Sequence, residues 1–185
     1  MSIDEDTHVG DGVISEKQFH GIFVNKFYRD RVQELKEKIR TGLEGEKPDE
    51  HSRRLKCCPN RKYNLGTCVD IRDGENTFVL FALMHFDDND KAHVSRAEYS
   101  HVVCELMKHL ASIAEDKPVF IPLFGTGLSR IQRPPQRILY QLVSILDFDD
   151  TNVIKGGVNI IIKSLKENDI NLSILEEVIK EGFSK

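Results

Sequence analysis

Apolar residues change their spacing along the chain, and this spacing divides the first half into a helix and two strands. Residues 16–43 carry apolar side chains at helical spacing, with a break expected near Gly21. Two runs of strand character follow at 66–73 and 76–86, separated by "DGEN", which is typical of a hairpin turn. The pattern therefore predicts a long helix followed by two strands joined by a hairpin or a short connection.

The second half alternates between the two spacings. Helices are predicted at 96–115, at 134–148 with prolines in its first turn, and at 171–183 with an Asn or Ser near its start. Buried apolar strands are predicted at 117–127 and 155–165. One stripe of the helix over 96–115 is apolar and consists of Tyr99, Val102, Val103, Leu106, Leu110 and Ile113. Strands that alternate with helices require crossover connections, so we expect an α/β fold with a mixed, largely parallel central sheet.

Composition fits one globular domain over residues 1–185. The chain is 39% hydrophobic and 30% charged, as is usual for soluble globular proteins. Residues 44–62 are charged, include two prolines and show no clear period, so they are predicted to form a surface loop.

Charge and cysteine content narrow the class of protein. A net charge of -4 argues against a domain that binds nucleic acid by neutralising phosphates. No apolar run approaches the roughly 20 residues of a membrane span. The four cysteines form no C-x-x-C motif, which fits reduced thiols in a cytosol better than a zinc site or a disulfide framework. We expect a cytoplasmic protein.

The segment "VFIPLFGTGLSR", residues 119–130, ends an apolar run in a glycine-rich turn. Ligands of α/β folds bind where a loop leaves the carboxyl end of a strand, and glycine lets backbone amides approach an anionic oxygen closely. The segment has neither the G-K-[ST] of a Walker A loop nor the third glycine of a dinucleotide fingerprint. The predicted ligand-binding residues of this loop are Leu123, Phe124, Gly125, Thr126, Gly127, Leu128, Ser129 and Arg130.

These residue types suit a diphosphate. Thr126 and Ser129 could donate from hydroxyl groups, and Arg130 could add a charge-assisted contact. The alternative is a tight strand-to-helix turn in which Arg130 is simply solvated.

A second glycine loop, "HVGDGVIS", precedes the first helix, whose start Ser15 and Gln18 could cap. Its position at a helix N-terminus favours binding of negative charge, and two such loops can hold one diphosphate. The alternative is a flexible N-terminal arm. The predicted binding residues of this loop are Gly10, Asp11, Gly12, Val13 and Ile14.

The segment "MHFDDNDKAH" gathers histidines and aspartates after a strand. It does not match the spacing of a calcium-binding EF-hand loop, and a solvated acidic loop is favoured over a metal site. His85 and Phe86, at the carboxyl end of the strand, are predicted to touch the ligand. We expect no metal, no cofactor and no catalytic residue.

The segments "GDGVIS", "YNLGTCVDI", "FVLFALMHFD", "SRAEYSHVV" and "PVFIPLFGTGLSRIQRPPQRIL" together resemble the macro-like domain of Thoeris antiphage effectors. The resemblance implies a macrodomain-like, three-layer α/β/α fold and an ADP-ribose-type ligand whose diphosphate lies between the loops Gly10–Ile14 and Gly125–Arg130. In that family a TIR enzyme makes an ADP-ribose derivative from NAD, which the macro domain senses.

The resemblance also implies what lies around the domain. Macrodomains have a strand and an Asn-bearing loop before the first glycine loop, and this sequence begins almost at that loop, so we expect N-terminal strands to be missing. Many effectors carry upstream transmembrane helices, so contact with the inner membrane is expected only through segments outside this sequence. We also expect a homo-oligomer.

Three functions remain open on the sequence. The preferred one is a non-catalytic sensor of an ADP-ribose derivative, such as histidine-linked ADP-ribose. The second is an ADP-ribosyl hydrolase of macrodomain type, for which Asp11 is the one candidate base. The third is a structural module in which the glycines only shape turns.

Overall fold

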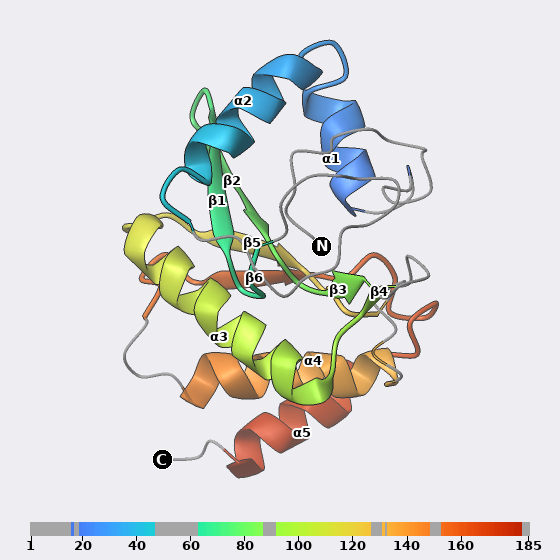
Figure 1. Cartoon of the computed structure of the whole chain (residues 1–185). Helices are drawn as coiled ribbons and strands as arrows, with labels where there is room; N and C mark the ends of the chain where they lie inside the picture. Colours follow the sequence, from blue (N-terminus) through green and yellow to red (C-terminus); the bar gives the residue numbers. More distant parts are fainter. Residues whose placement is uncertain are drawn as a thin grey trace. The chain divides into compact units, whose positions relative to one another are not determined.

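The computed structural model describes residues 16, 19–46, 63–86, 92–126, 131, 133–148 and 153–182. The chain forms two compact units, Met1–His93 and Val94–Lys185. The first unit contains the elements α1 (Phe19–Phe27), α2 (Val32–Gly42), β1 (Cys68–Asp73), β2 (Asn76–Phe81), β3 (His85–Phe86) and β4 (Ala92–His93) (Figure 1). The second contains α3 (Arg96–Ile113), β5 (Val119–Pro122), α4 (Pro135–Phe148), β6 (Val158–Ile161) and α5 (Leu172–Gly182).

The predicted helix over 16–43 is two helices, and the expected position of the break is wrong. Gly21 lies buried inside α1, whereas the chain leaves helical geometry between Tyr28 and Arg31. The Arg31 guanidinium donates a 3.0 Å hydrogen bond to the carbonyl oxygen of Phe27, one of the last carbonyls of α1. This contact satisfies a helix end that would otherwise need another partner. The proposed cap at Ser15 and Gln18 lies outside the described residues.

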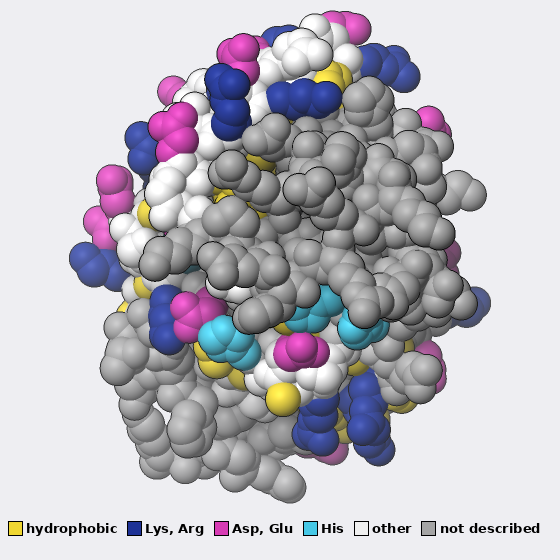
Figure 2. Space-filling view, in the orientation of Figure 1, with side chains coloured by type: hydrophobic (Ala, Val, Ile, Leu, Met, Phe, Trp, Pro, Cys, Tyr) yellow, Lys and Arg dark blue, Asp and Glu magenta, His cyan; other side chains and the backbone are white. Residues whose placement is uncertain are grey.

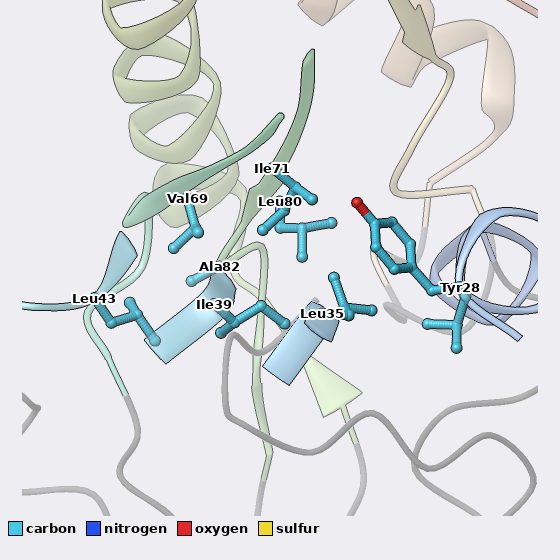
Figure 3. Packing of buried hydrophobic residues seen from close by; sticks show 9 residues of the cluster. Tyr28, Leu35, Ile39, Leu43, Val69, Ile71, Leu80 and Ala82 are labelled. Carbon is cyan, nitrogen blue, oxygen red and sulfur yellow. The ribbon is translucent and has the colours of Figure 1, made fainter. Parts of the chain in front are cut away.

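The core of the first unit forms between α2 and the hairpin β1–β2. Leu35 and Ile39 lie on one face of α2 and Leu43 follows as its C-cap residue, and these side chains are almost fully buried. They pack with residues of the hairpin and with Tyr28 (Figure 3). The remaining members of this cluster are Val24, Val69, Ile71, Leu80 and Ala82. Burial of each large aliphatic side chain contributes about 1.5–3 kcal/mol relative to exposure.

Charged side chains attach α2 to the hairpin on its exposed side, where Figure 2 shows both signs interspersed over the helix. Arg31 pairs with Asp73 at 2.8 Å, and its guanidinium carbon lies 4.8 Å from the centre of the Tyr28 ring. Lys38 pairs with Glu34 at 2.7 Å and also donates to the backbone of β1. The contacts of Arg31 with Asp73 and of Lys38 with the β1 backbone join residues far apart in the sequence.

The predicted hairpin is confirmed, with a shorter second strand than expected. β1 and β2 pair antiparallel around Gly74, whose φ of +60° suits the first central position of a two-residue turn. The predicted strand over 76–86 is divided, because pairing with β1 stops after Phe81 and His85–Phe86 pairs instead with Ala92–His93. Residues 47–62 of the predicted surface loop lie outside the described residues, and 44–46 form an exposed turn.

In the second unit, α3 begins at a capping box that the helical pattern alone did not reveal. The Ser95 hydroxyl accepts from the Glu98 amide, and the Glu98 carboxylate accepts from the Ser95 amide. The predicted stripe is buried except for Ile113, which is half-buried, while Met107 is buried in addition. The Gln141 amide donates to the Ser100 hydroxyl at 2.6 Å, which joins α3 to α4.

β5 and β6 pair in parallel, and α4 lies between them in the sequence. This arrangement confirms the predicted crossover connection. The described strands therefore combine parallel and antiparallel pairs with helices, which confirms the α/β class. The prediction that both strands are buried is wrong for one face of each strand. Ile121 is 4% exposed, whereas Phe120 is 64% and Ile161 50% exposed. This alternation is the normal consequence of the two-residue period of a strand. No helix among the described residues is long and apolar enough to cross a membrane.

Candidate ligand-binding loop after strand β5

The candidate loop leaves the carboxyl end of β5 and leads to α4. The Leu123 amide donates to the Ile161 carbonyl at 2.9 Å, so pairing with β6 extends just past the strand. Leu123 and Phe124 are 5% and 7% exposed, and Gly125 is buried. The structure therefore anchors the start of the loop in the core, and any ligand contact from Leu123 or Phe124 would come from the backbone.

Gly125 is required at its position for two independent reasons. Its φ is +90°, a region that residues with a side chain rarely adopt. A Cβ at this position would lie 2.8 Å from Cδ1 of Ile131 and 3.1 Å from Cε2 of Tyr99. The backbone of the turn thus rests directly on side chains of α3 and of the segment before α4, and a methyl group would require the Ile131 side chain to shift.

Tyr99 supports the same turn through its hydroxyl. This hydroxyl donates a buried 3.3 Å hydrogen bond to the carbonyl oxygen of Phe124, and the Tyr99 and Phe124 ring centres lie 5.7 Å apart. Burial raises the pKa of Tyr99, so the hydroxyl keeps its proton at physiological pH. The sequence pattern identified Tyr99 as a core residue but not as a support of the loop, because its acceptor is a backbone oxygen. The available signal was a tyrosine on a buried stripe, whose hydroxyl needs a partner.

Thr126 is half-buried and closes the turn upon itself. Its hydroxyl donates to the Leu123 carbonyl oxygen at 3.4 Å. A hydroxyl carries one proton, so in this geometry the Thr126 hydroxyl braces the loop. A role as donor to a ligand requires the hydroxyl to turn away from Leu123.

The loop leads to the N-terminal end of α4, which begins at Pro135 as the prolines of the sequence predicted. Ile138 in the first turn is buried, and its Cγ2 would lie 3.7 Å from a Cβ at Gly125. Arg133 and Arg137 are exposed here and add positive charge next to the loop in the sequence. A helix N-terminus with nearby arginine side chains favours binding of an anion.

The other predicted site residues lie elsewhere. His85 and Phe86 form β3 in the first unit, where the His85 ring centre lies 5.9 Å from that of His93 on the paired strand. Their role as ligand contacts stays a prediction. The remaining predicted binding residues lie outside the described residues and are Gly10, Asp11, Gly12, Val13, Ile14, Gly127, Leu128, Ser129 and Arg130.

Metal-binding side chains do not gather in the described part of the chain. No three histidine, cysteine, aspartate or glutamate residues lie together there in a way that could hold a metal ion. The aspartates that follow β3 in the sequence, Asp87, Asp88 and Asp90, fall outside this part.

Comparison with known proteins identifies the family. The family model described as the macro domain of Thoeris protein ThsA matches residues 5–163. The Thoeris protein ThsA of Bacillus amyloliquefaciens (strain Y2) is 26% identical over 126 residues, which cover 68% of this chain and 41% of that protein. The chain therefore spans less than half the length of this relative. The family match includes both glycine loops and ends before α5.

Proposed function

The chain belongs to the family of ThsA macro domains, and on this premise we propose that it binds an ADP-ribose-derived nucleotide as the signal of an antiphage defence system. It acts as a sensor and not as an enzyme. The observation that carries the proposal is the turn at Gly125, where positive φ and the absence of a Cβ combine at the carboxyl end of a strand.

The proposed contact is between loop amides and the diphosphate of the nucleotide. Backbone N–H groups of a glycine turn can converge on an anionic oxygen, and α4 follows with the positive end of its dipole. A neighbouring arginine side chain, Arg133 or Arg137, could add a charge-assisted contact. The role of the glycine loop Gly10–Ile14 as a further diphosphate contact stays a prediction from the sequence.

The signal belongs to the class made from NAD by TIR enzymes, and histidine-linked ADP-ribose is the proposed example. Binding of such a ligand shifts a conformational or assembly equilibrium only by the difference in its affinity for the two states. We propose that this equilibrium is the assembly of a homo-oligomeric effector.

The test is a calorimetric titration of the chain with ADP-ribose, histidine-linked ADP-ribose and cyclic ADP-ribose, followed by chromatography of the ligands after incubation. The expected result is saturable binding of at least one of them with the ligand recovered intact. Release of ADP-ribose or free ribose at a catalytic rate would instead assign the site to an ADP-ribosyl hydrolase. Absence of binding to all three would leave the loop as a structural turn and the proposal wrong.

A further inference from the structure

The peptide bond between Phe124 and Gly125 is held in one orientation from inside the core. Its carbonyl oxygen accepts the hydrogen bond of the Tyr99 hydroxyl, and Tyr99 itself is fully buried. The described residues include no cis peptide bond. In a planar trans peptide the C=O and N–H groups point in opposite directions, so the N–H of Gly125 points away from the Tyr99 hydroxyl.

The neighbouring carbonyl is also engaged, because the Thr126 hydroxyl donates to the Leu123 oxygen. Two successive carbonyl oxygens of the turn therefore have fixed partners. Without the hydrogen bond from Tyr99, the Phe124–Gly125 peptide could rotate, since glycine adopts both signs of φ readily. A rotated peptide would present a carbonyl oxygen where an amide had been, and an anion would be repelled instead of bound.

We propose that Tyr99 is a positioning residue for the nucleotide site, and that its hydroxyl fixes the Gly125 N–H toward an anionic oxygen of the ligand. This inference rests on the proposed function, because it assumes that a nucleotide diphosphate occupies the turn. The proposal gives α3 a role in binding through Tyr99, although the position of Tyr99 on the buried stripe suggests only a role in packing. The buried hydroxyl keeps its proton throughout the physiological range and is a permanent donor.

Tyr99→Phe tests the inference, because it removes the donor and keeps the ring that packs beneath the turn. Tyr140→Phe is the matched control: Tyr140 lies in α4 of the same unit, and its buried hydroxyl has no hydrogen-bond partner among the described residues. Calorimetric titration with ADP-ribose is expected to show about three- to tenfold weaker binding for Tyr99→Phe and the parent's affinity for Tyr140→Phe. Both variants are expected to unfold within a few degrees of the parent.

Two further readouts separate positioning from a structural role. The Gly125 amide resonance in a 1H–15N spectrum, identified by its absence in Gly125→Ala, is expected to differ in Tyr99→Phe before ligand is added and to move less at saturation with ADP-ribose. Replacement of Tyr99 by 4-aminophenylalanine restores an N–H donor on the same ring and is expected to recover most of the affinity. If the ring of Tyr99 served only packing, tyrosine, phenylalanine and 4-aminophenylalanine at this position would give the same affinity for ADP-ribose.

Unchanged ADP-ribose affinity in Tyr99→Phe, with an unchanged Gly125 resonance, overturns the inference and leaves the proposed function intact. Failure of the parent chain to bind ADP-ribose or either of its two derivatives overturns the proposed function and this inference with it. Weaker binding that 4-aminophenylalanine does not recover also overturns the inference, since the donor would then not be the cause.

Discussion

A Cβ at Gly125 would lie 2.8 Å from the Cδ1 atom of Ile131. Side-chain carbons do not approach this closely, so a larger residue would have to displace Ile131 or lift the turn from the core. The backbone φ of +90° adds a second restriction at the same position. The turn after β5 is thus shaped both by its own backbone and by the side chains beneath it.

Gly125→Ala is expected to weaken ADP-ribose binding at least tenfold, because the turn must move to accommodate the methyl group. Strain at positive φ costs about 1–3 kcal/mol, and the displacement of the Ile131 side chain adds to it, so the free energy of unfolding should fall as well. Urea unfolding measures the stability, and calorimetric titration of the folded protein measures the affinity.

Gly157→Ala is the control for this variant. Gly157 lies in the same unit at a φ of +81°, and a Cβ there would meet no described atom within 4 Å. It should therefore lose about 1–2 kcal/mol to backbone strain while binding ADP-ribose as the parent does. Equal affinities for the two alanine variants would show that the shape of the turn at Gly125 is unimportant for binding.

Gly156→Ala is expected to lower the free energy of unfolding of the second unit more than any side-chain truncation in the turn before β6. A Cβ on Gly156 would overlap the backbone carbonyl group of Lys117, which cannot move aside as a flexible side chain can. This contact lies where β5 and β6 begin to pair, since the Val119 amide donates to the Gly157 oxygen. Overpacking against backbone should cost about 1–3 kcal/mol in urea unfolding.

Lys155→Ala is the comparison, because it removes an exposed ion pair with Asp116 from the same turn. Exposed pairs contribute about 0–1 kcal/mol, so this variant should unfold close to the parent. If Gly156→Ala were as stable as Lys155→Ala, the close approach to Lys117 would not constrain the fold.

The helices and strands of the second unit were predictable because each carries a local signal. The stripe that begins at Tyr99 identified α3, the prolines at 134 and 135 identified the start of α4, and an Asn before α5 marked its cap, where Asn171 Oδ1 accepts from the Ser173 amide at 2.9 Å. The S-x-x-E pattern of Ser95 and Glu98 was equally available and predicts the start of α3.

The break between α1 and α2 was not predictable from its own stretch. Tyr28 continues the apolar helical spacing, so the local pattern favours an uninterrupted helix. Arg31, which follows the break, instead makes a long-range contact, since its side chain pairs with Asp73 on a strand 42 residues away. A contact between residues this far apart in the sequence gives no signal in a short stretch of sequence.

The candidate site was predictable in part for a related reason. Glycines at the end of an apolar run identified Gly125 as a backbone-specific position, and the structure supports this with its φ and its crowded environment. Tyr99 supports the loop by donating a hydrogen bond to the backbone oxygen of residue 124. Any residue at position 124 would offer this oxygen, so the sequence gives no signal of the contact. Sequence therefore located the loop, and only the fold showed what holds it.

Acid is expected to weaken the first unit through Asp73. The hydrogen bond and the charge of Arg31 lower the pKa of Asp73 below its ordinary value of 3.8. A carboxyl group whose pKa is lower in the folded state contributes stability above its unfolded pKa, and loses this contribution as the pH falls through the folded value. Parent and Asp73→Asn should therefore differ in urea midpoint above about pH 4 and converge below it.

The pair is exposed, so this difference should be small and should shrink in high salt, which screens charges at the surface. Urea unfolding from pH 2 to pH 7 at low and high ionic strength measures it. A difference between parent and Asp73→Asn that persists at pH 2 would point to a packing effect of the substitution and not to the ion pair.

Ligand binding is expected to stabilise the chain, because a nucleotide that binds only the folded state shifts the unfolding equilibrium by mass action. At a free ligand concentration of 100 Kd the gain is about 2.7 kcal/mol. The urea midpoint should therefore rise with histidine-linked ADP-ribose in the parent and in Gly157→Ala, and rise much less in Gly125→Ala at the same concentration. Because a sensor leaves its ligand intact, the rise should also persist over hours; a midpoint that drifts back as cleavage products accumulate would contradict the sensor and identify a hydrolase.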